Sequence, residues 1–382
     1  MEDNNKEINK NIETFLKEIY SENPEDMIIK INQIDGMTNQ NYQIIYNNKN
    51  DEKKSKEVLY RKYGNILDLS EHDKEIYIMK YLSNKKEGPN VLYISPNYRI
   101  VEFVNDSKII PLELRYEPKI LDNVIDILCK YTFISNVYKY SIDEVIKINL
   151  YHKNENNDEY KFPSILDILE KLFIKAEKNY NKFNEKFNEY FSKNKIDEKI
   201  KIMKSKYDIY IKDYKNKFLS LFPKNGFFIL CHNDCQRWNF LFKNLDTKLL
   251  IIDHEYACLG LPGLDLCNYF NENSFYFYDN GNYEFKKEEI NFNYYYKQYQ
   301  KYCHSFIQLN KIWLNKDENK EFLNLIQTKD YYLSLHSITN IFWFLFCVIN
   351  LDFEGDIIKK SEHYFEYGYD RLCYSELAQK KN

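Results

Sequence analysis

Alternating apolar and polar residues mark the first hundred positions of the chain as a sheet with few helices. Residues 27–34 and 42–46 alternate as two paired strands do, and residues 8–20 place apolar side chains at the spacing of a helix. The other elements predicted here are a helix over 71–82 and strands over 58–63, 91–94 and 98–103. This order of strands, one helix and further strands is typical of a small nucleotide-binding lobe.

The pattern becomes mainly helical from about residue 119 onward. Residues 164–222 are expected to form two charged helices with a break near Asn194, and their Lys and Glu runs are expected to form a solvated face. The apolar stretch Ile338–Leu351 is shorter than the ~18 residues of a membrane-spanning helix and contains Asn340. We therefore expect it to be a helix that is buried in the core.

A group of polar residues interrupts the helical region between short apolar runs. Residues 227–231 and 239–242 read as strands, and a further apolar run ends in Asp253. Asp234 lies on the loop between the two strands, and Asn239 begins the second strand. In phosphoryl transfer, one carboxylate accepts the proton of the attacking hydroxyl. An amide oxygen and a second carboxylate hold magnesium on the nucleotide phosphates.

The spacing of these polar residues favours that chemistry. Asp234 and Asn239 form Asp-x-x-x-x-Asn, which is the spacing of the kinase catalytic loop. Such a spacing also occurs by chance, because Asp and Asn favour turns. His232 directly before Asn233, the flanking apolar runs and Asp253 at a strand end favour a functional site. The sequence therefore predicts Asp234 as a general base, with Asn239 and Asp253 as magnesium ligands.

Two longer motifs surround these residues. One is His232-Asn233-Asp234-Cys235-Gln236 followed by Asn239-Phe240-Leu241, and the other is Ile252-Asp253-His254-Glu255-Tyr256 followed by Gly263–Glu272. In this order they resemble the two signatures of the choline/ethanolamine kinase family, and the resemblance runs from about residue 30 to 372. Position by position, the resemblance implies the same roles for Asp234, Asn239 and Asp253.

The chain departs from the family pattern within these motifs. Arg237 and Trp238 stand where the family usually has a small or acidic pair, and His254 stands where it usually has Phe. The pair Cys235–Gln236 after the predicted base is similar to choline kinases, because ethanolamine kinases tend to differ there. The departures leave the predicted base and magnesium ligands in place.

The resemblance also implies a set of nucleotide-binding residues. The expected ATP-binding residues are Gly36, Met37, Thr38, Asn39, Arg61, Glu75, Glu102, Phe103, Val104 and Gln236. The loop around Thr38 can present backbone N–H groups and a hydroxyl to phosphates, although hairpin turns also favour Asp-Gly. Arg61 lies in the middle of a half-buried strand and needs a partner, for which Glu75 is the candidate; otherwise Arg61 is a surface residue. Residues 102–104 are expected to be the hinge between lobes.

An ammonium substrate is recognised through negative charge and aromatic faces. The resemblance implies such groups near the second motif and in the helix around residue 343. The expected substrate-binding residues are Glu255, Glu272, Trp343, Phe346 and Phe353. Aromatic residues at helical spacing are also typical of a core, so a purely structural role stays open for the three aromatic ones.

Composition narrows the class of protein. The 382 residues carry a net charge of −4, which gives no basic footprint for nucleic acid. The chain has 36 Tyr and 26 Phe, so single aromatic residues count for little as functional signals. The eight cysteines include no Cys-x-x-Cys pair, which favours free thiols in a reducing compartment. Because the first residues are polar and no spanning helix is found, we expect a cytoplasmic protein without membrane insertion.

Together these observations and the resemblance predict an α+β, two-lobed, protein-kinase-like phosphotransferase fold. The β-rich nucleotide-binding lobe is expected over residues 1–104 and the large, mostly helical catalytic and substrate-binding lobe over 105–382. The expected function is Mg²⁺-dependent transfer of the ATP γ-phosphate to the hydroxyl of choline, which supplies phosphocholine for phospholipid synthesis. Alternatives are ethanolamine as acceptor, an aminoglycoside or another small alcohol as acceptor, and an inactive ATP-binding scaffold. The resemblance also suggests a homodimer.

Overall fold

The computed structural model describes residues 2–34, 40–49, 55–63, 72–105, 107–132, 162–193, 198–223, 227–242, 248–278, 282–310, 320–351 and 357–380. Contacts divide the chain into two compact units. The smaller unit comprises Met1–Ile109 and Leu241–Glu255, and the larger comprises Ile110–Phe240 and Tyr256–Asn382. The smaller unit thus includes a segment from the part of the chain that the sequence assigns to the second lobe. The functional division at residues 104 and 105 stays a prediction.

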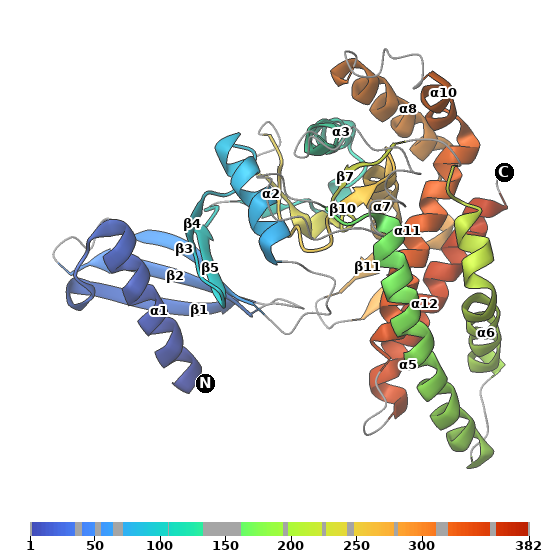
Figure 1. Ribbon diagram of the computed structural model, residues 1–382, viewed down its shortest axis with the longest axis horizontal. Helices are drawn as coiled ribbons and strands as arrows, with labels where there is room; N and C mark the ends of the chain where they lie inside the picture. Colours follow the sequence, from blue (N-terminus) through green and yellow to red (C-terminus); the bar gives the residue numbers. More distant parts are fainter. Residues whose placement is uncertain are drawn as a thin grey trace, which may run out of the picture. The chain divides into compact units, whose positions relative to one another are not determined.

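A five-stranded antiparallel sheet forms the centre of the smaller unit, in the order β1-β2-β3-β5-β4 (Figure 1). Its strands are β1 (Met27–Ile34), β2 (Gln40–Asn48), β3 (Lys56–Lys62), β4 (Val91–Ile94) and β5 (Tyr98–Glu102). Helix α1 (Glu2–Tyr20) lies along the sheet, and its buried stripe packs against strand residues such as Tyr42, Ile44 and Tyr60. The stripe consists of Ile8, Ile12, Phe15 and Leu16. Burial of this stripe explains why the apolar periodicity of the first residues predicts a helix.

The remaining elements of the smaller unit are one helix and a second small sheet. Helix α2 (His72–Asn84) lies between β3 and β4 in the chain, as the sequence predicts. Strands β6 (Lys108–Ile109), β8 (Phe240–Phe242) and β9 (Leu250–Ile251) form a three-stranded sheet in the order β6-β8-β9. Ile109 pairs with Leu241, so the segment after the predicted catalytic loop joins the first part of the chain.

The larger unit is mainly helical and is organised around α11 (Lys329–Ile349), which packs against α12 (Ile357–Gln379), α5 and α7. Its other helices are α3 (Pro118–Tyr131), α5 (Ile165–Lys193), α6 (Glu198–Leu219), α7 (Leu264–Glu272), α8 (Phe292–Leu309) and α10 (Lys320–Ile326). Its strands are β7 (Ile229–Cys231), β10 (Cys258–Gly260), β11 (Phe275–Phe277) and β12 (Tyr283–Phe285). The 3₁₀ turns among the described residues of both units are η1 (Pro24–Asp26), η2 (Leu112–Leu114), η4 (Arg237–Asn239) and η5 (Lys287–Glu289).

Helix α11 is the buried apolar helix that the sequence predicts. Among the described residues it is the one helix long and apolar enough to cross a membrane, but 83% of its apolar window is buried inside the protein. A helix that is apolar on all sides and surrounded by protein is typical of a core. The sequence therefore predicted its burial correctly, although the helix begins at Lys329 rather than near Ile338.

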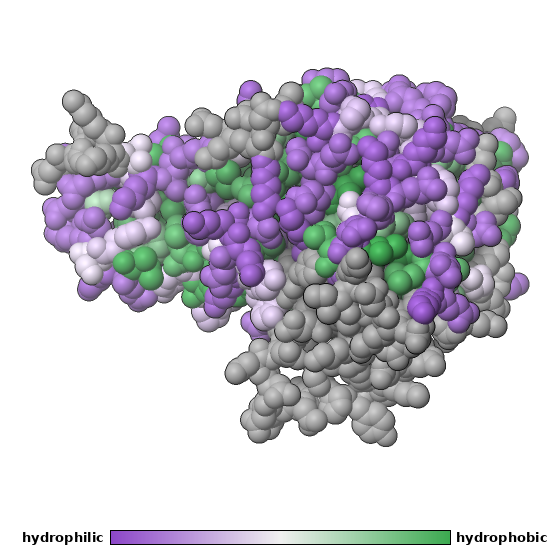
Figure 2. Space-filling view, turned by 90° about the horizontal axis from the view of Figure 1, so that it is seen from above, coloured by the Kyte–Doolittle hydropathy of each residue, from purple (hydrophilic) through white to green (hydrophobic). Residues whose placement is uncertain are grey.

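The charged helices of the larger unit also agree with the sequence. Helix α5 buries Ile165, Leu169 and Leu172 on one side, while Glu170 and Lys171 are exposed. The face shown in Figure 2 is mostly hydrophilic over the described residues, with apolar residues in small groups. The Lys and Glu runs thus form a solvated face, which is the structural role expected for them.

Candidate active site

The predicted base lies on a loop that its own polar residues close. Asp234 is buried and follows strand β7, where the chain turns back toward β8. The Asn239 side-chain N–H donates to the Asp234 carbonyl oxygen at 2.9 Å and to Asp234 Oδ2 at 2.8 Å. Gln236 Nε2 also donates to Oδ2, at 3.1 Å. The Asp-x-x-x-x-Asn spacing therefore allows the Asn239 side-chain amide to hold the Asp234 carboxylate in place within one loop.

Helix α7 holds the backbone of this loop. Asp265 accepts hydrogen bonds from the backbone N–H groups of His232, at 2.7 Å, and of Asn233, at 2.9 Å. Asn268 Oδ1 accepts from the backbone N–H of Cys235 at 2.5 Å. Residues three apart share a helix face, so one face of α7 orients the loop. Burial raises the pKa of Asp265 to about 6, although the two N–H groups oppose this.

The roles of Asp265 and Asn268 were not predicted from the sequence, even though both residues lie inside the second motif. The available signal was the occurrence of polar residues at helical spacing in a segment that is otherwise mainly apolar and that is buried along its whole length. The turn before the helix requires Gly263, which has φ +86°, because a Cβ there would collide with the ring of Tyr299. This glycine thus allows α7 to begin where its polar face meets the loop.

Two residues in the predicted site have a left-handed backbone. Asn233, directly before the predicted base, has φ 64°, and Asp253, the predicted metal ligand, has φ 66°. Asn and Asp adopt this region more readily than other side chains, but each still costs about 1 kcal/mol or more. Such conformations persist where the surroundings impose them, and they cluster at functional sites.

A buried charge cluster in the smaller unit surrounds Arg61. Its Nη1 donates to Asp253 Oδ1 at 2.8 Å and to Glu75 Oε1 at 3.3 Å, so the predicted pair with Glu75 is present. Arg99, opposite Arg61 in the β3–β5 ladder, binds Glu75 more closely, at 2.5 and 2.6 Å. Burial alone would raise the pKa of Glu75, but Arg99 and then Arg61 outweigh it and hold the pKa well below its usual value.

The other expected nucleotide-binding residues are placed only in part. Residues 36–39 lie outside the described residues, while the strands on either side pair through Ile34 and Asn41. Glu102 is the last residue of β5, and its Oε2 accepts a hydrogen bond from Asn90 Nδ2. Phe103 and Val104 follow directly after the strand. The structure leaves their role in binding adenine as a prediction.

The two acidic residues expected to bind the substrate lie in different units. Glu255 is buried in the smaller unit, where the Lys74 ammonium donates to its carbonyl oxygen at 3.1 Å. Glu272 ends α7 in the larger unit and is buried beside Arg371, whose Nη2 donates to Glu272 Oε2 at 2.7 Å. Tyr367 also donates to Glu272 Oε2, at 3.5 Å. Arg371 was not predicted from the sequence, because nothing in the sequence around this α12 residue indicates a partner on α7.

The expected aromatic residues differ in their surroundings. Trp343 is buried on α11, with ring contacts to Tyr256 at 5.4 Å and to Phe346 at 5.3 Å between centroids. Its indole N–H has no hydrogen-bond partner among the described residues. Phe346 is half-buried on the same helix, and Phe353 lies outside the described residues. Trp343 thus packs as a core residue in this structure, and its role toward a substrate stays a prediction.

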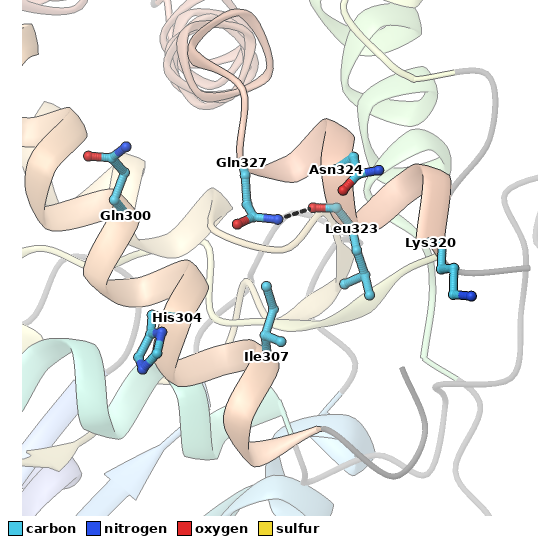
Figure 3. Close-up of a pocket in the computed structure, with 7 residues that line it drawn as sticks. All are labelled: Gln300, His304, Ile307, Lys320, Leu323, Asn324 and Gln327. Carbon is cyan, nitrogen blue, oxygen red and sulfur yellow. Dashed lines mark hydrogen bonds between the residues drawn. The ribbon is translucent and has the colours of Figure 1, made fainter. Parts of the chain in front are cut away.

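The described residues of the larger unit line a wide hollow and a narrow one. A wide one of about 600 Å³ is lined by residues of α8 and α10 and the turn after α10 (Figure 3). Its lining residues are Gln300, His304, Ile307, Lys320, Leu323, Asn324 and Gln327. None of the predicted site residues lines it. A narrow hollow is lined instead by the loop residues Gln236, Arg237 and Trp238 together with Glu272.

The donor chemistry fits magnesium better than a transition metal. Asn239 uses only its amide nitrogen in the two bonds to Asp234, which leaves its amide oxygen for a cation. Asp253 is partly exposed, and Oδ1 is the oxygen that Arg61 binds. Among the described residues no group of three or more His, Cys, Asp or Glu side chains could hold a metal ion. Magnesium in kinases needs no such group, because one or two protein oxygens and the nucleotide phosphates complete its shell.

Solved structures with the same fold define the class of protein. The crystal structure of choline kinase from Cryptosporidium parvum Iowa II matches with a TM-score of 0.63 and 18% identity, covering 99% of this chain and 96% of that one. Plasmodium vivax ethanolamine kinase matches with a TM-score of 0.55 and 20% identity, covering 94% of this chain and 85% of that one. The fold is therefore the protein-kinase-like phosphotransferase fold that the sequence predicts.

Sequence comparison then identifies the family. The choline/ethanolamine kinase family model matches residues 31–375, which is most of the chain. A relative described as a probable ethanolamine kinase, from Arabidopsis thaliana, is 25% identical over 336 residues, or 87% of this chain and 75% of the relative. This chain belongs to the choline/ethanolamine kinase family.

Proposed function

We propose that this chain transfers the γ-phosphate of ATP to the hydroxyl of choline. The observation that carries the proposal is the closed loop in which Asn239 fixes Asp234 while Asp265 holds the loop backbone. That loop is the part of a kinase that must be ordered before the acceptor arrives. Membership of the family supports a small amino alcohol as the acceptor.

The proposed chemistry assigns one role to each polar group. The acceptor hydroxyl oxygen bonds to the γ-phosphorus as the bond to the bridging oxygen of ADP breaks, and Asp234 takes the hydroxyl proton. Asn239 and Asp253 are the proposed magnesium ligands, and magnesium would neutralise charge on the phosphates. Arg61 is the proposed phosphate-binding cation, held in place by Glu75 and Asp253. The loop Gly36-Met37-Thr38-Asn39 and the hinge residues 102–104 complete the proposed nucleotide site.

Glu272 is the proposed attraction for the ammonium group, with Glu255, Trp343, Phe346 and Phe353 as further proposed contacts. Gln236 donates to Asp234 Oδ2, so the residue pair that favours choline over ethanolamine directly contacts the predicted base. Ethanolamine is the alternative acceptor, and the Arabidopsis thaliana relative is described as a probable ethanolamine kinase. Free thiols and balanced charge support a cytoplasmic enzyme, with a homodimer as the proposed assembly.

A coupled ADP-release assay tests the proposal. The purified full chain with ATP and Mg²⁺ is given choline, ethanolamine, an aminoglycoside or no acceptor. We expect ADP release that depends on choline, with a higher kcat/KM for choline than for ethanolamine. A preference for ethanolamine would transfer the proposal to that acceptor. Release with the aminoglycoside alone, or release that no acceptor stimulates, would overturn it.

A further inference from the structure

Lys74 on helix α2 is a buried cation to which the proposed function assigns no role. The residue is 0% exposed, and its Nζ donates to the carbonyl oxygen of Glu255 at 3.1 Å. A lysine is rarely buried to this extent, because removing water from an ammonium group is costly unless protein oxygens replace the water. Glu255 lies two residues after Asp253, the proposed magnesium ligand. This contact therefore joins α2 to the segment that carries a proposed metal ligand.

The segment from Asp253 to Glu255 has a backbone that needs support. Asp253 has φ 66°, and His254 and Glu255 are buried directly after it. A left-handed residue other than glycine is strained and persists only where its surroundings hold the backbone. The bond from Lys74 gives such support, since it fixes a backbone oxygen two residues beyond the strained position. Movement of the backbone at Glu255 would therefore change the direction of the Asp253 carboxylate.

Glu75, the next residue of α2, holds the same segment at a second point. Its Oε1 accepts a hydrogen bond from Arg61 Nη1 at 3.3 Å, and the same nitrogen donates to Asp253 Oδ1 at 2.8 Å. All of these residues belong to the smaller unit. Helix α2 thus fixes the backbone through Lys74 and, through Arg61, one oxygen of the carboxylate. Two attachments of this kind give Asp253 Oδ2 a defined direction.

Two other roles for Lys74 predict different behaviour. A lysine that binds the phosphates directly would raise the affinity for ATP even without metal. A lysine that only stabilises the fold would affect the free energy of unfolding and leave the effect of metal on ATP binding unchanged. Burial of the ammonium group and its contact with the backbone favour positioning over direct contact with phosphates, which need an accessible cation.

We propose that Lys74 is a positioning residue, which holds the backbone after Asp253 and so orients Asp253 Oδ2 for magnesium. The proposal rests on the proposed function, in which Asp253 is a magnesium ligand. Groups that orient a metal ligand without touching the metal typically contribute roughly tenfold to a hundredfold to metal affinity. Loss of Lys74 should therefore weaken the binding of nucleotide with magnesium and leave the metal-free binding of nucleotide unchanged.

Calorimetric binding of an ATP analogue that cannot transfer its γ-phosphate tests this role without any turnover. The affinity of the full chain for adenylyl imidodiphosphate is measured with Mg²⁺ and without metal, and the ratio of the two affinities gives the magnesium effect. Lys74→Met removes the ammonium group and keeps most of the aliphatic stem. We expect it to lower the magnesium effect by roughly tenfold, with the metal-free affinity within about twofold of wild type. Lys80→Met, which changes an exposed lysine on the same helix, should match wild type.

A double-mutant cycle with Asp253→Ala shows whether Lys74 acts through Asp253. In that background we expect Lys74→Met to change the magnesium effect by less than about twofold, because the ligand that Lys74 positions is gone. Denaturant unfolding identifies the folded variants, and Lys74→Gln replaces Lys74→Met if the latter does not fold. An unchanged magnesium effect in the folded variant, or a loss that persists in Asp253→Ala, would overturn the proposal. A loss of metal-free affinity alone would also overturn it, in favour of direct phosphate binding.

The magnesium effect also separates this proposal from the proposed function. A Lys74-dependent magnesium effect in a chain that phosphorylates neither choline nor ethanolamine would support the positioning role and overturn the proposed function. Turnover of choline with a magnesium effect that is independent of Lys74 would support the proposed function and overturn the positioning role. In active protein at saturating Mg²⁺, we expect the KM for choline to be the same in wild type and Lys74→Met, because Lys74 acts on the metal ligand.

Discussion

Asp253 combines two unusual features in one residue. Its backbone has φ 66°, and its carboxylate binds Arg61 through Oδ1 at 2.8 Å. The side chain is only 23% exposed, so the pair is shielded enough to hold its geometry. Because Arg61 binds Oδ1 of Asp253, Oδ2 is the oxygen that could bind a metal ion. If Asp253 holds magnesium, as proposed, the strained backbone directs a carboxylate that is bound by protein on one side only.

Substitution of Asp253 tests the metal role. Asp253→Ala removes both oxygens, and we expect kcat to fall to about one hundredth of wild type or lower, because the cation would lose its carboxylate ligand. Raising Mg²⁺ should restore little activity. Binding of ATP without metal, measured by calorimetry, serves as the control for folding. Wild-type behaviour across the Mg²⁺ titration would remove Asp253 from the metal site.

Asp265 predicts a pH dependence of activity. Its pKa is raised to about 6, and the carboxylate accepts hydrogen bonds from two backbone N–H groups of the loop that carries the predicted base. Below pH 6 it gains a proton and loses two charge-assisted hydrogen bonds, so kcat should fall as pH decreases through about 6. The contribution of Asp265 to the free energy of unfolding should instead increase as pH decreases through about 6. A carboxyl group whose pKa is higher in the folded state than in the unfolded state contributes to stability. This contribution is complete when the pH is below the pKa of the unfolded state, and it is lost as pH rises through about 6.

Asp265→Asn checks this account, because the amide does not titrate. We expect its kcat to be roughly tenfold or more below wild type at pH 7.5, with little change between pH 5.5 and 7. Asp126→Asn, which alters a partly exposed carboxylate on α3, should keep the wild-type profile. An acid limb near pH 6 that persists in Asp265→Asn would assign that limb to another group.

Single residues also show where sequence reasoning stops. Asp234 and Asn239 were predictable, because a local spacing defines the bond between them. The Arg61–Glu75 pair was predictable from burial of a charge on a strand. Arg99 and Arg371 were not, because their partners depend on strand register and on helix packing between residues far apart in sequence.

At the scale of elements, helix α7 orders the loop that carries the predicted base. Its nine residues are all buried, and three of them are polar at positions that face the loop or Arg371. They are Asp265, Asn268 and Glu272, at i, i+3 and i+7 on one face. A shift of this helix would therefore move the predicted base and the proposed substrate anchor together.

Glu75 is expected to stabilise the smaller unit, because it links two buried arginines on neighbouring strands. Glu75 on α2 joins Arg61 on β3 to Arg99 on β5, so it offsets the repulsion of two arginines that face each other across the ladder. We expect Glu75→Gln to lower the unfolding free energy by about 3–5 kcal/mol, since it leaves two buried cations with one carboxylate. Glu13→Gln on the exposed side of α1 should change it by less than about 0.5 kcal/mol.

The pH dependence of unfolding provides the second test of Glu75. Because the pKa of Glu75 is lower in the folded state, its contribution to stability is complete above the pKa of the unfolded state, which is about 4.3. The contribution is lost as pH falls through the pKa of the folded state. Denaturant unfolding of wild type between pH 5 and 2.5 should therefore show a loss that Glu75→Gln lacks. Parallel pH profiles for the two proteins would contradict the assigned ion pairs.

Most elements were predictable from periodicity, and the exceptions have physical causes. Strands β1 and β4 match their predicted bounds, because alternation is strongest where one face of a sheet is buried. Helix α1 begins at Glu2, before the predicted residue 8, since its first residues are polar and carry no apolar signal. Strands β10, β11 and β12 were missed, because strands of three residues are too short to show a period.

At the scale of the whole molecule, the chain returns to its first unit after Phe240. Segment Leu241–Glu255 belongs to the smaller unit and carries Asp253 and Glu255, whereas Asp234 and Glu272 belong to the larger one. This return arises because β8 pairs with β6. None of the eight cysteines forms a disulfide, and seven are buried, as expected for thiols that serve packing.

Direct detection of the product tests the central claim, that Asp234 promotes phosphoryl transfer to the hydroxyl of an amino alcohol. The wild-type chain and Asp234→Asn are incubated with ATP, Mg²⁺ and choline, and ³¹P NMR follows phosphocholine. We predict one phosphate monoester on choline per ADP from wild type, and a rate at least ~10²-fold lower from Asp234→Asn with ATP binding retained. ATP consumption without an ester of choline or ethanolamine, or an Asp234→Asn rate within a few fold of wild type, would contradict the account.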